Sequence, residues 1–408
     1  MSRQAPTATG SPLVITLDAS PTALEFALYE AHEHLGAPLF RGAIREIGPD
    51  ARFVLDHCPD DNTGNWRVES ASHDAALSEL LRWLEQHPCR PEIAAAGHRV
   101  IHGGDLFSRP VLLNASTLRQ LEALVPLAPL HMPHNLAVIR ALSRQLPAIP
   151  QVACFDTAFH HDMPLVERYF AIPHRWQDMG VRRYGFHGLC YESIAEALPD
   201  YMGKAADGRI VVARLGSGVS LCAMHGRRSV ATTTSFSPLD GVPGATGCGT
   251  LDPGAVVYLL QQGCDAETID RELHFESGLL GLSGTSGDMR TLLASHQPAA
   301  RLAVDLFIHQ VHRAIGSLAA ALGGLDALVF TAGIGENAPR IRQRLCDLGS
   351  WLGLKLDNEA NVAGRGRISP KHAVPSVWVI PADEARMVAR HTVRLTGSLI
   401  TLPSSSRY

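Results

Sequence analysis

Two strand-like runs of the sequence end directly in glycine-rich loops that could hold phosphate groups. One loop is Arg214 to Gly218 (RLGSG), and the other is Gly333 to Asn337 (GIGEN). Glycines let backbone N–H groups approach a ligand closely, and the start of a helix attracts anions. We expect the second loop to enter a helix around Glu336 or Asn337. Together the loops favour a nucleotide-binding protein, although each alone is also typical of a tight structural turn.

Several charged side chains near other strand-like runs are candidates for anion binding or catalysis. They are Asp156 at the end of VACFD, Arg99 in AGHRVIHGGD, His187 in VRRYGFHG, and Asp288 with Arg290 in SGTSGDMR. Arginine matches carboxylate and phosphate oxygens with paired donors. Ligands of open α/β sheets bind at the carboxyl ends of strands, which is where Asp156 falls. A solvated surface arginine, and an aspartate that only caps a turn, remain the structural alternatives.

The elements that must position these residues alternate between strand-like and helical patterns. LVITLD, PVLLN, VACFD, RIVVARL and DALVF are strand-like, and residues 74–86 and 300–322 are amphipathic at helical spacing. This alternation predicts an α/β protein with much parallel sheet. The N-terminal stretch PLVITLDASPTALEFALYE predicts a β-hairpin with strands of about six residues and a tip at Ala19 to Thr22.

The bulk composition is that of a soluble globular protein with two domains. The chain has 408 residues, of which 46% are hydrophobic and 19% charged, and a formal net charge of −4. With no basic excess, we expect neither a nucleic acid nor an acidic membrane as a partner. No secretion signal or membrane-spanning run is visible. The eight cysteines form no C-x-x-C pair, which favours buried thiols in a reducing cytoplasm.

Taken together and in this order, the motifs resemble the acetate kinase family. The matching blocks are GHRVIHGGD, APLHMPHNL, FDTAFHHDMP, RRYGFHG, SGLLGLSGTSGDMR, GGLDALVFTAGIGEN and VIPADEARMVAR, and the likeness extends from Leu13 to Thr396. The resemblance implies an α/β fold of the actin-like, sugar-kinase-like (ribonuclease H-like) type, with two domains and a central cleft. It implies a first domain of residues 12–157 and 386–408, a second of residues 158–385, and a flexible tail of residues 1–11.

The resemblance also implies an activity and its residues. Family members are cytoplasmic homodimers that move a phosphoryl group between ATP and a short-chain carboxylic acid, with Mg²⁺, to give ADP and an acyl phosphate such as acetyl phosphate. Arg99 would bind the acid, Asp156 would be the essential carboxylate, and His187 would stabilise the transferring phosphoryl group. Asp18 and Glu384 would bind the metal. The nucleotide would contact Arg214, Leu215, Gly216, Ser217, Gly218, Asp288, Met289, Arg290, Gly333, Ile334, Gly335, Glu336 and Asn337.

Several positions depart from the pattern of the family that the chain resembles. That family's hairpin reads approximately N-x-G-S-S-S-x-K, so Glu25 replaces a lysine; near phosphates this exchange costs about 1–4 kcal/mol per charge pair. Its block GTRSGDLDP is ATGCGTLDP here, so Gly247 replaces an arginine that contacts the phosphoryl group. Losing such an arginine can cost about a thousandfold in rate. The remaining departures are Asp18, Pro21, Ala23, Tyr191 (for the second histidine of GFHGTSH), Arg214, Ser217 and Thr250.

These departures leave two main hypotheses. In the first, the protein is a working acyl kinase, with weak activity or an altered acid preference, in which Arg214 partly replaces the missing arginine. In the second, it is a catalytically degenerate relative that binds a nucleotide or an acid in a regulatory role. A third, a dehydrogenase with Gly333 to Ala338 as a dinucleotide loop, lacks support from the other motifs. Retention of Arg99, Asp156 and His187 favours the kinase.

Overall fold

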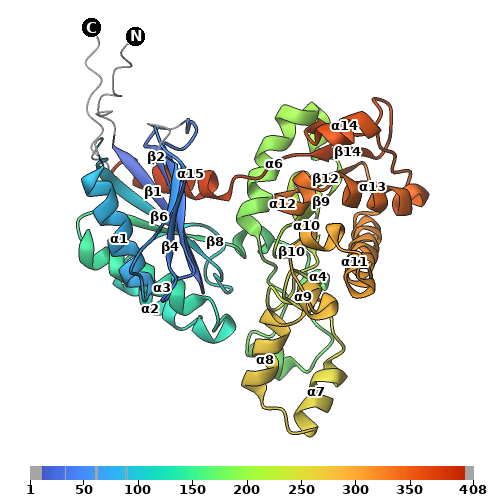
Figure 1. Ribbon diagram of the computed structural model, residues 1–408, viewed down its shortest axis with the longest axis horizontal. Helices are drawn as coiled ribbons and strands as arrows, with labels where there is room; N and C mark the ends of the chain where they lie inside the picture. The colour runs from blue at the N-terminus through green and yellow to red at the C-terminus, as the bar shows by residue number, and fades with distance from the viewer. Residues whose placement is uncertain (1–11, 33, 60–62, 88, 90, 400–408) are drawn as a thin grey trace. The chain divides into compact units, whose positions relative to one another are not determined.

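The structure is a computed structural model that describes residues 12–32, 34–59, 63–87, 89 and 91–399 (Figure 1). Its packing divides the chain into two compact units. Unit 1 consists of Met1–Ala158 and Asp383–Tyr408, and unit 2 consists of Phe159–Ala382. The tail expected at residues 1–11 lies outside the described residues.

Unit 1 is built on an eight-stranded mixed sheet with the order β5-β4-β3-β2-β1-β6-β8-β7. Strands β1, β6 and β8 are parallel neighbours, and the remaining pairs are antiparallel. The strands are β1 (Leu13–Ser20), β2 (Ala23–Glu30), β3 (Phe40–Arg45), β4 (Arg52–His57), β5 (Gly64–Arg67), β6 (Ile93–Val100), β7 (Val111–Leu112) and β8 (Gln151–Phe155). The run PVLLN gives only the short β7, because Asn114 already caps the next helix.

The N-terminal hairpin is longer than its sequence pattern predicted. Strands β1 and β2 have eight residues each, and they stay paired up to Ser20 and Ala23, so that the turn is reduced to two residues. One of these is Pro21. Proline has a fixed φ and no backbone N–H to donate to the neighbouring strand, so strand pairing stops at this residue and the turn forms here. The pairing places Glu25 directly opposite Asp18.

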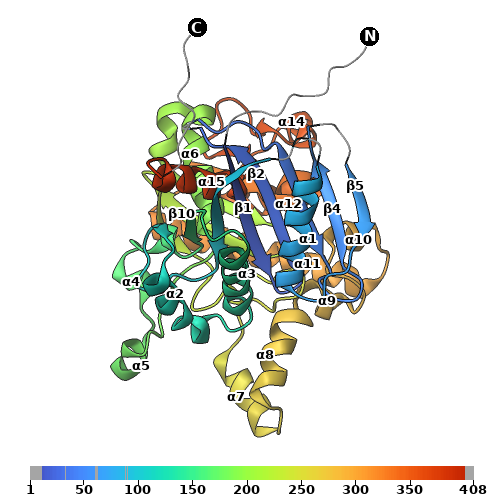
Figure 2. The same cartoon turned by 90° about the vertical axis from the view of Figure 1, so that its left-hand side faces the viewer.

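Helices cover both faces of the unit 1 sheet. Helices α1 (His73–Gln86), α2 (Ala115–Glu122) and α3 (Met132–Gln145) lie on one face, in front of the sheet in Figure 2, and α15 (Glu384–Thr396) packs on β6, β1 and β8. The amphipathic pattern at 74–86 is thus a helix, as predicted. At Gly97 of β6 an added Cβ would lie 2.2 Å from Thr392 Oγ1. Only glycine allows α15 to pack this close to the strand.

Unit 2 has a six-stranded sheet with the order β11-β10-β9-β12-β14-β13. Its strands are β9 (Arg209–Leu215), β10 (Val219–His225), β11 (Arg228–Thr232), β12 (Ala327–Thr331), β13 (Gly366–Arg367) and β14 (Ser376–Val379). Strands β9, β12 and β14 are parallel. Both faces are buried, as expected for parallel strands: Val211 and Ala213 pack in one core cluster, and Ile210 and Val212 in another.

Two long helices contribute to these core clusters in unit 2. Helix α11 (Pro298–Leu322) confirms the pattern at 300–322 and contributes Phe307, Val311 and Ile315 to one cluster, while α6 (Gly188–Met202) contributes Ile194 and Leu198 to the other. The remaining helices are α4 (Leu165–Arg168), α5 (His174–Asp178), α7 (Pro253–Gln261), α8 (Ala266–Phe275), α9 (Gly278–Ser283), α10 (Met289–Ala294), α12 (Ala332–Asn337), α13 (Pro339–Leu348) and α14 (Asn358–Ala363).

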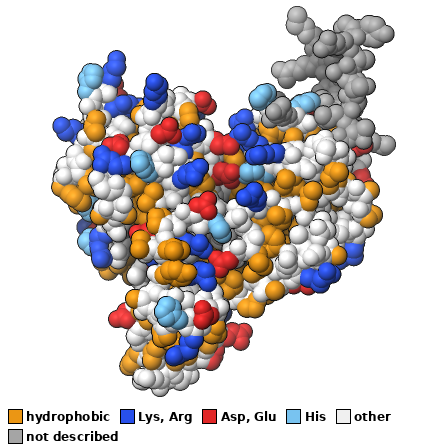
Figure 3. Space-filling view, turned by 180° about the vertical axis from the view of Figure 1, so that it is seen from behind, with side chains coloured by type: hydrophobic (Ala, Val, Ile, Leu, Met, Phe, Trp, Pro, Cys, Tyr) orange, Lys and Arg blue, Asp and Glu red, His pale blue; other side chains and the backbone are white. Residues whose placement is uncertain are grey.

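The surface charges, the helices and the cysteines can be compared with what the composition predicted. On the face seen in Figure 3, basic and acidic side chains are interspersed. Of the helices that the structure describes, none has both the length and the apolar character of a membrane span. All eight cysteines are free thiols; five are buried, Cys89 and Cys248 are half-buried, and Cys264 is exposed.

A buried histidine of β6 makes the stability of the protein depend on pH. His98 Nε2 lies 2.8 Å from Gln151 Oε1, and burial lowers the pKa of His98 from 6.5 to about 4. Between these values the unfolded chain binds a proton that the folded one does not. The free energy of unfolding therefore falls as the pH is lowered through this window, by up to about 1.4 kcal/mol per pH unit for this group.

We expect His98→Gln to remove the contribution of His98 to the dependence of the unfolding free energy on pH. Urea unfolding at several pH values, from neutral down to about the folded pKa, measures this dependence. His57→Gln is the matched control, because His57 is exposed on β4. An unchanged slope in His98→Gln would contradict the prediction.

Candidate functional site

The carboxyl ends of three parallel strands bring a set of charged side chains together in unit 1. Asp18 of β1 is in register with Arg99 of β6. Asp156 directly follows β8, and its backbone N–H donates to Val100 O at 3.0 Å. Glu384, the first residue of α15, lies 3.7 Å from Arg99 through Oε2. Arg99, expected to bind the acid, Asp18 and Glu384, expected to bind the metal, and Asp156, the expected essential carboxylate, thus form one cluster.

Arg99 is held in this cluster by carboxylates. Its Nε and Nη2 donate to the two oxygens of Asp156 at 2.9 and 2.6 Å, and its Nη1 donates to Asp18 Oδ2 at 2.6 Å. Asp156 is fully buried, whereas 19% of the Arg99 side chain is exposed. A bidentate pair of this kind fixes the plane of the guanidinium group. One edge of the group is therefore fixed to the protein core, while the exposed part can be reached by a ligand.

The cluster holds more acid than base. Burial, and then the charges of Glu384 and Asp18, raise the pKa of Asp156 against the opposing effect of Arg99. Partial burial and the charge of Asp18 raise the pKa of Glu25, with Arg99 and Arg45 acting in the other direction. Burial would lower the pKa of Arg99, but its carboxylate neighbours outweigh it and raise that pKa well above the usual value.

The donor chemistry of this cluster fits a hard divalent cation. Carboxylate oxygens are the ligands that Mg²⁺ uses, and this ion typically takes one or two of them together with phosphate oxygens and water. Within the described residues, no group of three or more acidic, histidine or cysteine side chains forms a complete metal cage. Asp18 and Glu384 could therefore hold such an ion only with help from a bound substrate.

In unit 2 the two glycine-rich loops lie side by side at the carboxyl ends of β9 and β12, the central strands of the sheet. Strands β9 and β12 are parallel and in register up to Arg214 and Thr331. A Cβ added to Gly216 would lie 3.5 Å from Ala332 Cβ. Arg214 Nη1 donates to Gly218 O at 3.0 Å, so its guanidinium group lies against the tip of the hairpin. Two segments far apart in the sequence thus form one surface.

A further loop connects this tip with the segment Asp288–Arg290. Ala245 N donates to Ser217 O at 2.8 Å, and a Cβ on Gly287 would lie 2.7 Å from Ala245 O. Arg290 pairs with Asp288 at 3.0 Å and is 90% exposed. The side chains of Met289 and Leu215 are buried in the core. Of these two candidates only the backbone can meet a ligand.

The helix after β12 begins earlier than predicted. Helix α12 starts at Ala332, with φ of 65°, and not around Glu336 or Asn337. Glu336 turns back, and its Oε1 accepts from Ala332 N at 2.8 Å. The side chain of Glu336 therefore occupies the helix start, where an anion was expected. Ser, Thr, Asp and Asn usually cap this position, and here a glutamate one turn later replaces them.

A buried arginine donates hydrogen bonds to the backbone of α12. Arg342 is fully buried, and its Nη1 donates to Gly335 O at 2.9 Å and to Glu336 O at 2.8 Å. Its Nε donates to Asn361 Oδ1 at 2.8 Å. The carbonyl oxygens at the C-terminal end of this short helix, which have no partner within the helix, thus accept hydrogen bonds from Arg342.

His187 lies beside the tip of the β9–β10 hairpin. It caps α6 with a left-handed backbone (φ of 60°). Its Nδ1 is 2.8 Å from Ser220 Oγ, and a Cβ added to Gly218 would lie 3.3 Å from its Nε2. Ser220 was not among the residues predicted from the sequence. Its position on β10, two residues after the tip of the hairpin, was the signal that could have identified it.

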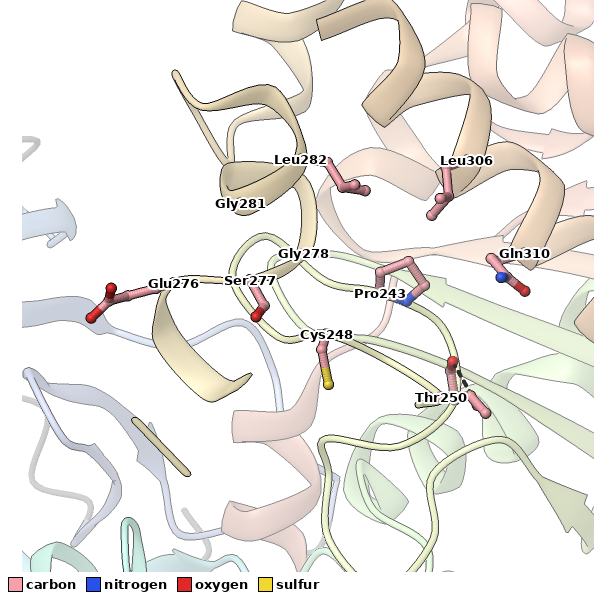
Figure 4. A pocket seen from close by; sticks show the side chains of 11 residues that line it. Pro243, Cys248, Thr250, Glu276, Ser277, Gly278, Gly281, Leu282, Leu306 and Gln310 are labelled. Atoms are coloured by element: carbon pink, nitrogen blue, oxygen red, sulfur yellow. Dashed lines mark hydrogen bonds between the residues drawn. The ribbon is translucent and has the colours of Figure 1, made fainter. Parts of the chain in front are cut away.

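A cavity of about 450 Å³ lies next to the loop that carries Gly247 (Figure 4). Cys248 and Thr250 of that loop and Leu306 and Gln310 of α11 line it. Gly247 itself has space, because an added Cβ would meet only Leu239 Cδ1, at 3.5 Å.

Comparisons with known proteins agree along nearly the whole chain. The model of the acetokinase family matches residues 13–390. An acetate kinase of Rhodopseudomonas palustris is 49% identical over 395 residues, which cover 94% of this chain and 98% of that protein. A crystal structure of a propionate kinase from Francisella tularensis subsp. tularensis SCHU S4 is 32% identical, with a TM-score of 0.88 over 94% of this chain and 100% of the other.

A crystal structure of Porphyromonas gingivalis acetate kinase gives a similar result. It is 31% identical, with a TM-score of 0.85 over 94% of this chain and 100% of that chain. These neighbours confirm the predicted fold class, an actin-like α/β fold with two sheets.

The buried pair of Arg99 and Asp156 should contribute strongly to stability. Arg99→Met leaves a buried carboxylate without its partner, so we expect the free energy of unfolding to fall by about 3 kcal/mol. Arg41→Met is the control, because Arg41 pairs with Asp383 at 3.0 Å but both are about two-fifths exposed, and such pairs contribute at most about 1 kcal/mol. Urea unfolding of both variants measures the difference; equal losses would refute the prediction.

Proposed function

The chain belongs to the acetokinase family, and we propose that it catalyses the reversible transfer of the γ-phosphoryl group of ATP to acetate. A carboxylate oxygen of the acid attacks the γ-phosphorus, the bond to the bridging oxygen breaks, and its electron pair leaves with ADP. The products are ADP and acetyl phosphate. The observation that carries this proposal is the match over nearly the full length with proteins named acetate kinase. The same match favours an enzyme over a regulatory binder without turnover.

In unit 1 we assign the acid to Arg99. Three of its N–H groups donate to Asp156 and Asp18, and a guanidinium group has five, so two can still meet a carboxylate. Asp156 is buried and bonded through both oxygens; its role is to keep the guanidinium plane fixed. Orientation of this kind supplies much of the catalysis in phosphoryl transfer, where little covalent chemistry is needed.

In unit 2 we assign the nucleotide to the surface formed by Arg214–Gly218 and Gly333–Asn337, with Asp288–Arg290 at its side. Backbone N–H groups at glycine positions and the Arg214 guanidinium group provide donors for phosphate oxygens. His187 would donate from Nε2 to the transferring phosphoryl group. Preorganised donors at such a position stabilise the charge of the transition state.

The excess of carboxylates around Arg99 supports a metal cofactor. An anionic acid and a triphosphate would be repelled by Asp18, Glu25 and Glu384 unless a cation reduced the negative charge. We propose that Asp18 and Glu384 hold Mg²⁺ together with phosphate oxygens. When bound, the ion neutralises charge on the phosphates. We further propose, on family likeness alone, a homodimer in the cytoplasm.

The direct test is ADP release by the full-length protein with ATP, MgCl2 and a series of straight-chain acids from acetate to valerate. We expect release that depends on the acid, with acetate or propionate preferred. Asp156→Asn, purified in the same way, controls for contaminating kinases and should be inactive. If no acid raises ADP release above the control without acid, the enzyme assignment fails, and calorimetry with ATP then tests the regulatory alternative.

Gly247→Arg should raise the rate. An added Cβ there meets only Leu239 Cδ1, at 3.5 Å, and the family likeness implies a guanidinium group at this position near the phosphates. Arginine fingers contribute about 10³–10⁵ in kcat, so we expect a gain of at least about tenfold. Gly247→Ala adds the Cβ without the charge and should give no gain. Unchanged kcat in Gly247→Arg would show that another cation, such as Arg214, already supplies this charge.

A further inference from the structure

A buried chain of hydrogen bonds leads from Tyr191 through Ser220 to His187. Tyr191 OH lies 2.5 Å from Ser220 Oγ, which lies 2.8 Å from His187 Nδ1. We propose that Tyr191 is a positioning residue that fixes the proton of neutral His187 on Nε2, the ring nitrogen beside the tip of the β9–β10 hairpin. For its effect on turnover this inference rests on the proposed function; for the state of His187 it does not.

The hydrogen of Tyr191 determines the direction of the chain. Tyr191 is fully buried, and burial, followed by the charge of Cys222, raises the pKa of its hydroxyl well above the usual 10. The group therefore keeps its proton. A buried O–H without an acceptor is costly, and Ser220 Oγ is its hydrogen-bond partner in the described part of the chain. Tyr191 thus donates and Ser220 accepts.

Ser220 then has one hydrogen to give, and it gives it to His187. The Ser220 oxygen has two lone pairs, and one of them accepts from Tyr191. Ser220 is fully buried, and its single hydrogen has His187 Nδ1 as its remaining partner in the described part of the chain, so the Ser220 O–H points at Nδ1. In neutral imidazole one nitrogen donates and the other accepts. Since Nδ1 accepts, the proton lies on Nε2. A hydrogen on Nδ1 would instead occupy the second lone pair of Ser220 Oγ and would leave the buried Ser220 O–H without an acceptor.

The backbone of His187 is held in place independently. His160 Nε2 lies 3.0 Å from the carbonyl oxygen of Phe186, which can only accept, so His160 is the donor. Phe186 N donates to Thr234 Oγ1 at 2.9 Å. The left-handed φ of 60° at His187 costs free energy in a residue with a Cβ, and these two bonds on Phe186 help to maintain it.

The fixed proton lies where the proposed phosphates bind. Nε2 is next to Gly218, and Arg214 is in cross-strand register with Ser220. The side chains of Arg214 and Ser220 therefore lie on the same face of the hairpin. The Nε2–H of His187 and the Arg214 guanidinium group can both reach an anion at the tip. Tyr191 itself touches no ligand and acts through Ser220.

The experiment is NMR of full-length protein labelled with ¹⁵N-histidine, with His187→Gln used to assign the signals. In the wild type we expect Nε2 to carry the proton at neutral pH; a proton on Nδ1 overturns the proposal. In Tyr191→Phe the competing donor to Ser220 Oγ is lost, together with an O–H dipole whose hydrogen points toward His187. The pH at which His187 takes up its second proton should therefore rise, by up to about one unit. No rise overturns the proposal.

Activity gives the second readout. In Tyr191→Phe we expect kcat for ADP release to fall about tenfold with KM changed much less. Tyr184→Phe is the matched control, because it removes another hydroxyl of unit 2, one that donates to Gly180 O at 2.8 Å; it should leave both readouts unchanged. If Tyr191→Phe does not fold, Ser220→Thr should keep, and Ser220→Ala lose, the wild-type titration. Absence of kinase activity in the wild type would remove the proposed function, while the NMR result would still decide the proton position.

Discussion

Parallel strand pairing in register is the constraint on which both charged clusters depend. In unit 1 it places Asp18 beside Arg99 and lets Asp156 follow β8 at the same edge. In unit 2 it places Thr331 beside Arg214. Because parallel strands finish at a common edge, residues remote in sequence meet without any long-range loop to hold them. A shift of one residue in the register of any of these strands would turn the side chains of that strand to the opposite face.

Charge balance is the second determinant of the chemistry in unit 1. Asp18 and Asp156 hold a single guanidinium group by short, charge-assisted bonds, and Glu384 lies 3.7 Å from it. This arrangement orients Arg99 well but leaves little net attraction for an anion. Glu25 adds to this deficit, since it lies opposite Asp18. Binding of an acid at the proposed site would depend on an additional cation more than it would in a cluster with a basic excess.

The sequence predicted the architecture better than the local chemistry. Strand–loop patterns identified the segments at Arg214–Gly218 and Gly333–Asn337, and periodicity identified α11, because burial on a sheet or a helix face leaves a regular pattern. The start of α12 was wrong, because the cap comes from Glu336, a residue type that seldom caps. The contact between Tyr191 and Ser220 joins a helix to a strand, and no pattern in either segment encodes such a tertiary pair.

The burial of Arg342 has a consequence for how ligands meet unit 2. Its bonds to Gly335, Glu336 and Asn361 hold the segment after β12 rigid in the absence of any ligand. A loop that is ordered beforehand does not lose conformational entropy when a molecule docks, so more of the contact energy appears as affinity. For the nucleotide proposed to bind here, the same bonds mean that neither its arrival nor its departure requires this segment to fold or unfold.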